Sequence, residues 1–318
     1  MLLAIGALVA GLGLLAIAPD RFMAGSAALA DRFGVSRIVI GAVVIGFGTS
    51  TPEMLVSGVA ALRDEPEVGI GNIVGSNIAN IGLIVGVAAL VCRLSVPAGL
   101  LRRELPLTVA ATLAFAIAVQ DGIERGEAVV LLACLAVSIV VLVRVAGVSE
   151  GESGELVDEI GEFLAEEEVL PPRRFVVDVV LGLVGTLVGA QLLVSGALEV
   201  ADQFDLSGGF VGVTVVALGT SLPELVTAVV AARAGEDQLI LGNVLGSNLF
   251  NSLAVGGIVG LAGPAAVDDA SLTVGAVGLM LAMTALGTVA MIRKQKVTRG
   301  EALTLLVTYL ACVPLLAA

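Results

Sequence analysis

Long apolar runs separated by short polar breaks form the dominant pattern along this chain. Runs of about 20 apolar residues recur from its beginning to its end, and a helix needs about that length to cross a lipid bilayer. The first and sixth runs are longer, so their helices are expected to tilt or to extend into the membrane interface. The pattern predicts an all-α polytopic membrane protein with ten transmembrane helices, at 1–33, 37–62, 69–92, 104–120, 127–147, 174–204, 208–233, 238–262, 271–292 and 300–317.

The two halves of the chain are related by an internal repeat. A shift of 171 residues aligns them without a gap, and 36–86 and 207–257 share 19 identical residues in 51 positions. Because each half carries five predicted spans, the second half enters the membrane from the opposite side, which makes the repeat an inverted one. The predicted units are a five-helix repeat at 1–148, a linker at 149–173 and a second five-helix repeat at 174–318.

The basic residues between the predicted spans indicate the orientation in the membrane. With the N-terminus outside, the inner loops contain thirteen Lys and Arg residues, whereas the outer loops contain only Arg63 and Arg125. This difference follows the positive-inside rule. We therefore predict a multi-pass protein of the cell (plasma) membrane with its N-terminus outside. Inverted repeats of this kind are typical of secondary transporters.

The composition excludes several classes of function. Hydrophobic residues make up 58% of the 318 residues, the mean hydropathy is +1.07 and the formal net charge is −13. Such a chain is too apolar for a soluble protein, and its acidity argues against nucleic acid as a partner. The absence of histidine excludes a serine–histidine hydrolase site and imidazole metal ligands. We expect neither an enzyme nor a bound cofactor.

The predicted linker at 149–173 is strongly acidic. Nine acidic residues lie between Glu150 and Glu168, and no basic residue follows them before Arg173. Blocks of like charge repel one another and stay solvated, which favours an open cytoplasmic linker. A regulatory cation-binding loop is the alternative.

Two related motifs place a glutamate directly after a proline inside apolar runs. They are GFGTSTPEM at 46–54 and ALGTSLPEL at 217–225. Proline has no amide hydrogen, so helices are expected to break at Pro52 and Pro223, at the depth of the membrane midplane. Such a break lets backbone carbonyls and the negative end of a half-helix face a cation. A kink that only shapes packing is the alternative.

Glu53 and Glu224 are the main candidates for binding a cation. An ionised carboxylate inside the bilayer costs several kcal/mol, and no Lys, Arg or His lies within either motif. A bound metal ion is the simplest compensating charge, and a permanently protonated glutamate is the alternative. Thr49 and Thr220 precede these glutamates by four residues, so each pair is expected to share a helix face.

A second repeated motif supplies neutral polar side chains. It reads GNIVGSNIAN at 71–80 and GNVLGSNLFN at 242–251, and its Asn, Ser and Asn residues recur every four positions along one helix face. Asn72 and Asn243 are expected to form interhelical hydrogen bonds. With the two carboxylates, the remaining members form a set of hard oxygen donors that suits sodium and calcium and fits zinc or copper poorly. Those remaining members are Ser76, Asn80, Ser247 and Asn251.

These motifs resemble those of a known family. GFGTSTPE with GNIVGSNIAN, repeated as ALGTSLPE with GNVLGSNLFN, closely resembles the paired alpha repeats of the sodium/calcium exchangers, in the calcium/cation antiporter superfamily. The similarity covers essentially the whole chain and is greatest to the compact prokaryotic members. It implies an alternating-access antiporter with four ion positions at the midplane, one favouring calcium and the others sodium. It also implies that the first and sixth spans slide to expose the site to either side.

The resemblance further implies a set of ligands. Glu53 and Glu224 match the central carboxylates of the family. Asn251 departs from its pattern, because some prokaryotic exchangers have aspartate there. The other matching positions are Thr49, Ser50, Ser76, Asn80, Thr220, Ser221 and Ser247, with backbone oxygens at Gly46 and Ala217.

The expected function is therefore electrogenic exchange of Na⁺ for Ca²⁺ by a monomer embedded in membrane lipid. Two alternatives stay open at this stage, a Ca²⁺/H⁺ antiporter and a K⁺-dependent Na⁺/Ca²⁺ antiporter. In each case the transported ions are substrates and no cofactor is expected.

Overall fold

The computed structural model describes residues 1–33, 46–146, 172–267 and 269–316, and helices make up nearly all of its regular structure. The predicted linker at 149–173 lies outside these residues except for its last two positions, where a long helix begins.

Six described helical segments are long and apolar enough to cross a membrane. A bent pair, Gly208–Thr220 with Leu222–Arg233, adds a seventh if it is counted as one span. The predicted spans at 37–62, 104–120 and 300–317 are not among them and stay predictions; the first of these begins outside the described residues. The six segments are Leu2–Arg32, Pro66–Val91, Arg125–Arg144, Arg174–Phe204, Asp237–Ala262 and Ser271–Lys294.

Among the described residues of the first half, the helices are α-helical apart from one π-helical turn, η2. In chain order they are α1 (Leu2–Leu15), α2 (Ala18–Arg32), α4 (Gly46–Thr49), α5 (Thr51–Ala61), α6 (Pro66–Ala79), η2 (Asn80–Ile84), α7 (Val85–Val91), α8 (Ala98–Arg102), α9 (Glu104–Ala118) and α10 (Arg125–Ala146).

The second half has three π-helical turns among its described residues. Its helices are α12 (Pro172–Phe204), α13 (Gly208–Val211), η3 (Gly212–Val216), α14 (Ala217–Thr220), α15 (Leu222–Ala234), α16 (Asp237–Phe250), η4 (Asn251–Val255), α17 (Gly256–Ala262), η5 (Ser271–Ala276), α18 (Val277–Lys294) and α19 (Arg299–Leu316).

The first predicted span, at 1–33, is divided into two helices rather than being one long helix. α1 ends at Leu15, and α2 begins at Ala18 with Pro19 in its first turn. Proline cannot donate the hydrogen bond that would continue α1, and its ring crowds the preceding turn. The corresponding span of the second half, α12, has no proline after Pro172 and runs without a break for 33 residues.

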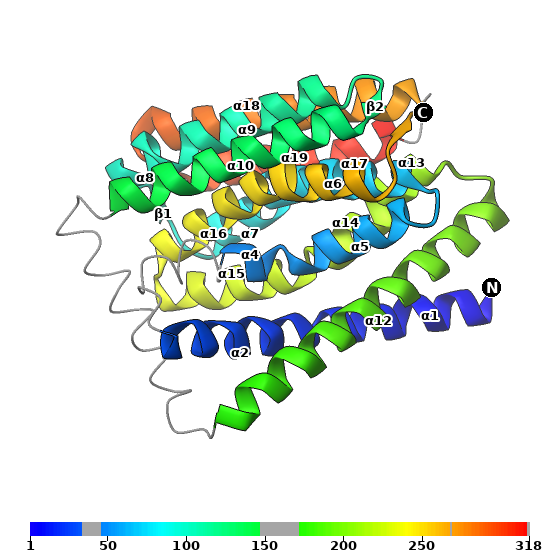
Figure 1. The fold of residues 1–318 in the computed structure, drawn as a ribbon. Helices are drawn as coiled ribbons and strands as arrows, with labels where there is room; N and C mark the ends of the chain where they lie inside the picture. Colours follow the sequence, from blue (N-terminus) through cyan, green and yellow to red (C-terminus); the bar gives the residue numbers. More distant parts are fainter. Residues whose placement is uncertain (34–45, 147–171, 268, 317–318) are drawn as a thin grey trace.

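α1, α2 and α12 form a separate layer along one side of the molecule, where α12 crosses the other two helices (Figure 1). Glycines allow this close crossing. A Cβ atom added at Gly11 would lie 2.7 Å from the backbone nitrogen of Leu193, and one added at Gly182 would lie 2.4 Å from that of Phe22. The opposite face of α12 exposes a row of aliphatic side chains, as expected for a lipid-facing helix. That row includes Val176, Val177, Val180, Leu181, Val184 and Val188.

The most buried spans lie at the centre of the remaining helices. For both α6–α7 and α16–α17, 83% of the most apolar stretch is buried within the protein, against 28% for the segments that contain α1 and α12. These two central spans carry the second repeated motif. Most of its polar side chains are therefore buried within the protein, and Asn243 is only partly buried.

Two short antiparallel ladders connect the halves at opposite ends of the molecule. β1 (Leu94–Ser95) pairs with β4 (Lys296–Val297), and β2 (Gly122–Ile123) pairs with β3 (Ala265–Ala266). β1 and β3 are related by the 171-residue shift, yet β1 lies at one end of the helices and the β2–β3 ladder at the other (Figure 1).

The small-residue spacing of Gly71 with Gly75 on α6, and of Gly242 with Gly246 on α16, predicts close helix contacts. The structure has such a contact at the first pair, whereas no described atom lies within 4 Å of a Cβ added at either glycine of the second pair. A Cβ atom at Gly71 would lie 2.6 Å from the carbonyl oxygen of Gly209, and one at Gly75 would lie 2.2 Å from that of Val213. α6 thus packs with its backbone almost directly against α13 and η3, the turns that lead into the second glutamate motif.

We predict that Gly75→Ala destabilises the protein by about 1–3 kcal/mol, because the neighbouring backbone has to move to admit a methyl group. The matched control is Gly278→Ala on α18, where no described atom lies within 4 Å of the added Cβ. Thermal unfolding of the two purified variants in detergent measures the difference. Equal unfolding temperatures would contradict the close packing of α6 on η3.

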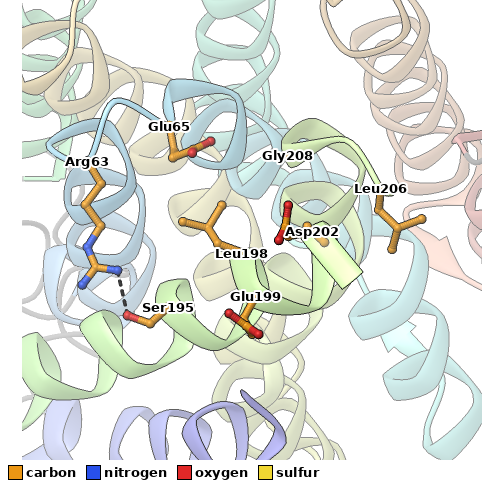
Figure 2. A pocket seen from close by; sticks show the side chains of 9 residues that line it. Arg63, Glu65, Ser195, Leu198, Glu199, Asp202, Leu206 and Gly208 are labelled. Carbon is orange, nitrogen blue, oxygen red and sulfur yellow. Dashed lines mark hydrogen bonds between the residues drawn. The ribbon is translucent and has the colours of Figure 1, made fainter. Parts of the chain in front are cut away.

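Arg63 connects α12 to the central helices. It lies in the turn after α5, and its guanidinium donates a hydrogen bond to Ser195 Oγ on α12 at 2.7 Å (Figure 2). The guanidinium also donates to Gln191 Oε1 on the same helix. Ser195 Oγ in turn donates to the carbonyl oxygen of Gln191 at 2.6 Å. The basic side chain thus joins the separate layer to the end of a motif helix.

A surface pocket of about 540 Å³ opens beside Arg63, between the end of α12 and the turn before α6 (Figure 2). Its lining includes Glu65, Glu199 and Asp202. Burial raises the pKa of Glu65 above its usual range, and the charges of Glu67 and Asp64 raise it further. None of the predicted ligands lines this pocket.

We predict that Arg63→Gln lowers the stability by about 0.5–1.5 kcal/mol, because two hydrogen bonds between α12 and the central helices are lost. Arg125→Gln, at an exposed arginine at the start of α10, controls for the loss of one positive charge. Thermal unfolding again reports the effect. A decrease of the same size in both variants would show that the loss of charge, and not the link to α12, is responsible.

Candidate functional site

The two glutamate motifs interrupt their helices at equivalent positions. α4 ends at Thr49 and α5 begins at Thr51, while α14 ends at Thr220 and α15 begins at Leu222. The serines between them have nearly the same backbone, with φ −90° and ψ 7° at Ser50 and φ −87° and ψ 1° at Ser221. Around Ser221 the two helical pieces meet at 43°.

The prolines explain where the breaks fall. Pro52 and Pro223 occupy the first turns of α5 and α15, where a missing amide hydrogen costs nothing. Each break places the following glutamate in the first turn of the new helix. There the positive end of the helix dipole favours a negative charge.

Glu53 and Glu224 are buried, with 1% and 5% of their surfaces exposed, and they are close enough for their charges to interact. Within the described part of the chain, neither carboxylate oxygen of Glu53 has a hydrogen-bond partner of ordinary geometry, and neither does Glu224 Oε2. Burying a carboxylate without partners costs several kcal/mol. The pair is therefore suited to bind a positive charge.

Hydroxyl groups from each half meet hydroxyl groups from the other half beside these carboxylates. Thr49 Oγ1 lies 3.4 Å from Ser247 Oγ, and Thr220 Oγ1 lies 3.4 Å from Ser76 Oγ. The two pairs are related by the 171-residue shift. The structure thus brings residues of the first motif in one half to residues of the second motif in the other half.

Asn72 forms interhelical hydrogen bonds, as expected from the sequence. Its Nδ2 donates to Ser57 Oγ at 2.9 Å, and its Oδ1 accepts from Thr220 Oγ1 at 3.0 Å. Its counterpart Asn243 is only partly buried. The position that corresponds to Ser57 is Ala228, so the same bond cannot form in the second half.

The four predicted side-chain ligands not yet described, Ser50, Asn80, Ser221 and Asn251, are buried, and each has an oxygen without a described hydrogen-bond partner. Asn80 donates through Nδ2 to Asn248 Oδ1 at 2.9 Å. The following atoms have no hydrogen-bond partner among the described residues: Ser50 Oγ, Ser221 Oγ, Asn80 Oδ1, Asn251 Oδ1 and Asn251 Nδ2.

The two predicted backbone ligands differ in their surroundings. The carbonyl oxygen of Ala217 accepts a hydrogen bond from the backbone nitrogen of Ser221 at 3.0 Å. Thr220 Oγ1 lies 3.2 Å from the same oxygen, but its single hydrogen has a nearer acceptor in Asn72 Oδ1. Gly46 is the first residue of α4, and the residues before it lie outside the described ranges.

Asn77 and Asn248 are buried polar residues that the sequence analysis did not single out. Asn77 Nδ2 donates to Ser252 Oγ at 3.0 Å, and Asn248 accepts from Asn80. Both are identical in the two repeats, within GSN of the second motif. Their identity in the two repeats could have indicated a polar role, but they lie one position away from the Asn–Ser–Asn stripe of the second motif.

The chemistry of this region is that of oxygen donors. No group of three or more His, Cys, Asp and Glu side chains that could hold a metal ion occurs in the described residues. Two carboxylates, hydroxyls and amide oxygens are hard ligands, which bind Na⁺ and Ca²⁺ in preference to softer transition metals.

Comparison with known proteins gives the family. A family model described as sodium/calcium exchanger protein matches residues 3–144 and 175–317. Inner membrane protein YrbG of Escherichia coli (strain K12) is 34% identical over 271 residues, covering 84% of this chain and 82% of YrbG. Sodium/calcium exchanger MaX1 of Methanosarcina acetivorans is 30% identical over 335 residues, covering 96% of this chain and 95% of MaX1.

A solved structure gives the same result. The sodium-calcium exchanger NCX_Mj, soaked with 10 mM Na⁺ and 10 mM Sr²⁺, matches with a TM-score of 0.66 at 30% identity, and the match covers 98% of both chains. The membrane fold of this protein is therefore that of NCX_Mj. The resemblance seen in the motifs is confirmed, and the chain belongs to the sodium/calcium exchanger protein family.

Proposed function

We propose that this protein exchanges Na⁺ for Ca²⁺ across the membrane by alternating access, and that the exchange is electrogenic. Membership in the family makes it a cation exchanger of the membrane. The observation that carries the proposal is the pair of buried carboxylates, Glu53 and Glu224, which lie among neutral oxygens contributed by both halves of the chain. Such a pair is matched in charge by one Ca²⁺ ion.

The proposed ligands are the motif residues together with those that the resemblance to the sodium/calcium exchangers implies. The cross-pairing of their hydroxyls and the unpartnered oxygens of Ser50, Ser221, Asn80 and Asn251 support the assignment. The carbonyl oxygen of Ala217 already accepts a hydrogen bond from Ser221, which leaves its second lone pair for a cation. The set consists of Glu53, Glu224, Thr49, Ser50, Thr220, Ser221, Ser76, Asn80, Ser247, Asn251, Gly46 and Ala217.

The proposed architecture is two inverted repeats of five helices, at 1–148 and 174–318, with broken helices at the midplane and a cytoplasmic acidic linker. Three observations support it: the 171-residue shift, the two related Thr–Ser pairs, and the β-ladders at opposite ends of the helices. An inverted repeat allows one set of ligands to face either side in turn. The orientation we propose has the N-terminus outside the plasma membrane, and the working unit is a monomer.

The stoichiometry we propose, three Na⁺ for one Ca²⁺, follows from the resemblance to the sodium/calcium exchangers, because charge balance alone also allows two Na⁺ for one Ca²⁺. With Asn80 and Asn251 both neutral, Glu53 and Glu224 give the site a fixed charge of about −2 at neutral pH. One Ca²⁺ ion neutralises this charge, whereas three Na⁺ ions leave about +1. The step that carries sodium therefore moves positive charge through the membrane field, at about 2.3 kcal/mol per 100 mV.

We predict that Glu53→Gln and Glu224→Gln each reduce exchange at least about 100-fold, because one of the two charges that compensate the divalent ion is lost while the shape is kept. The matched control, Glu199→Gln, removes an exposed acid from the surface pocket and is expected to retain exchange. ⁴⁵Ca²⁺ uptake into proteoliposomes measures all three. Parent-level exchange in either motif variant would contradict the role of that carboxylate.

We further predict that sodium-loaded proteoliposomes take up ⁴⁵Ca²⁺ faster when a potassium/valinomycin potential makes their interior positive. Exchange of three Na⁺ for one Ca²⁺ moves one positive charge outward, and this potential assists that movement. Uptake that requires sodium but ignores the potential would indicate a neutral two-for-one exchange. Uptake driven by a proton gradient alone, or uptake that requires potassium as a co-substrate, would favour the Ca²⁺/H⁺ or the K⁺-dependent alternative.

A further inference from the structure

Asn248 lies beside the proposed ligand Asn80 and accepts a hydrogen bond from its amide nitrogen. We propose that Asn248 is a positioning residue for cation binding: it holds the amide nitrogen of Asn80, so that the oxygen Oδ1 is the end left for a cation. This inference rests on the proposed function, which assigns Asn80 as an oxygen ligand.

The orientation follows from a short series of hydrogen bonds that begins at a backbone carbonyl. A carbonyl oxygen can only accept, so Asn248 has to direct its nitrogen, Nδ2, to the carbonyl oxygen of Asn77, at 3.4 Å. Its oxygen then faces Asn80 and accepts from Asn80 Nδ2 at 2.9 Å. Asn80 Oδ1 is consequently at the other end of the amide, where it is buried and has no described hydrogen-bond partner.

The polarity matters because the two ends of an amide have opposite effects on a cation. The oxygen is a ligand of Na⁺ and Ca²⁺, whereas the NH₂ group carries positive partial charge and repels them. An unrestrained asparagine can turn either end towards the ion. All three groups in the series are buried, so no bulk water competes for the bond between Asn248 and Asn80.

The repeat-related position does not provide the same restraint. Asn77 corresponds to Asn248, but its Nδ2 donates to Ser252 Oγ at 3.0 Å, and its Oδ1 has no described partner. The residue that corresponds to Ser252 in the first half is Ile81, which cannot accept a hydrogen bond. One substitution between the repeats thus separates the roles of Asn77 and Asn248. Asn251, the counterpart of Asn80, has neither amide atom partnered among the described residues.

The test is a double-mutant cycle on Ca²⁺ binding by the purified full chain, with calorimetry and Ca²⁺-dependent thermal stabilisation as readouts. Asn248→Ala and Asn80→Ala are each expected to weaken Ca²⁺ binding about tenfold. The double variant is expected to bind like Asn80→Ala alone, because Asn248 acts only through Asn80. A merely structural role would instead weaken binding by the same factor in both backgrounds.

Asn77→Ala is the matched control. It removes the same side chain from the repeat-related position and keeps the backbone carbonyl that orients Asn248. Its effect on Ca²⁺ binding is therefore expected to be the same with and without Asn80. If Asn248→Ala does not fold, Asn248→Ser provides the same cycle, since its shorter side chain does not reach Asn80.

Two outcomes would overturn the inference, and they are distinguishable. If Asn80→Ala weakens binding but Asn248→Ala weakens it equally in both backgrounds, Asn248 is not a positioning residue and the proposed function stands. If Asn80→Ala binds Ca²⁺ like the parent, Asn80 is not a ligand, and both the inference and that part of the proposed site are wrong.

Discussion

Two carboxylates buried together in an apolar interior are the constraint on which the rest of this structure depends. Glu53 and Glu224 are almost fully buried, and their charges interact. Keeping both ionised requires surrounding dipoles and a positive charge. The breaks before Pro52 and Pro223 satisfy the first requirement by placing each glutamate in the first turn of a helix, where the dipole favours an anion. A bound cation would satisfy the second.

The polar contacts around the carboxylates mostly join one half of the chain to the other. Thr49 meets Ser247, Thr220 meets Ser76 and Asn72, and Asn80 meets Asn248. The site therefore exists only where the halves are packed together, and a shift of one half against the other changes its oxygens as a group. Backbone-to-backbone packing at Gly71 and Gly75 keeps this contact close.

Small departures from the repeat make the two sides of the site unequal. Ser57 is replaced by Ala228 in the second half, and Ile81 by Ser252. The first difference gives Asn72 a hydrogen bond that Asn243 cannot form. Because of the second difference, Asn77 Nδ2 donates to Ser252 Oγ, whereas Asn248 Oδ1 accepts from Asn80 Nδ2. A nearly symmetric scaffold can thus present differently oriented oxygens on its two sides, which suits a protein that binds ions of different charge.

The length of the apolar runs was sufficient to predict a helical membrane protein, because a helix must match the thickness of the bilayer. The missing amide hydrogens of Pro52 and Pro223 were sufficient to predict the two helix breaks, and the residues that recur in both motifs were sufficient to indicate the family. Packing decided the rest. The break before Pro19 follows from a local rule that was not applied there, but the crossing of α12 over α1 and α2 depends on glycines far apart in the chain. The roles of Asn77 and Asn248 also could not be predicted, since identical residues in identical motifs differ only through the partners that the tertiary structure brings to them. A hydrogen bond between residues 168 positions apart has no periodic signal in the sequence.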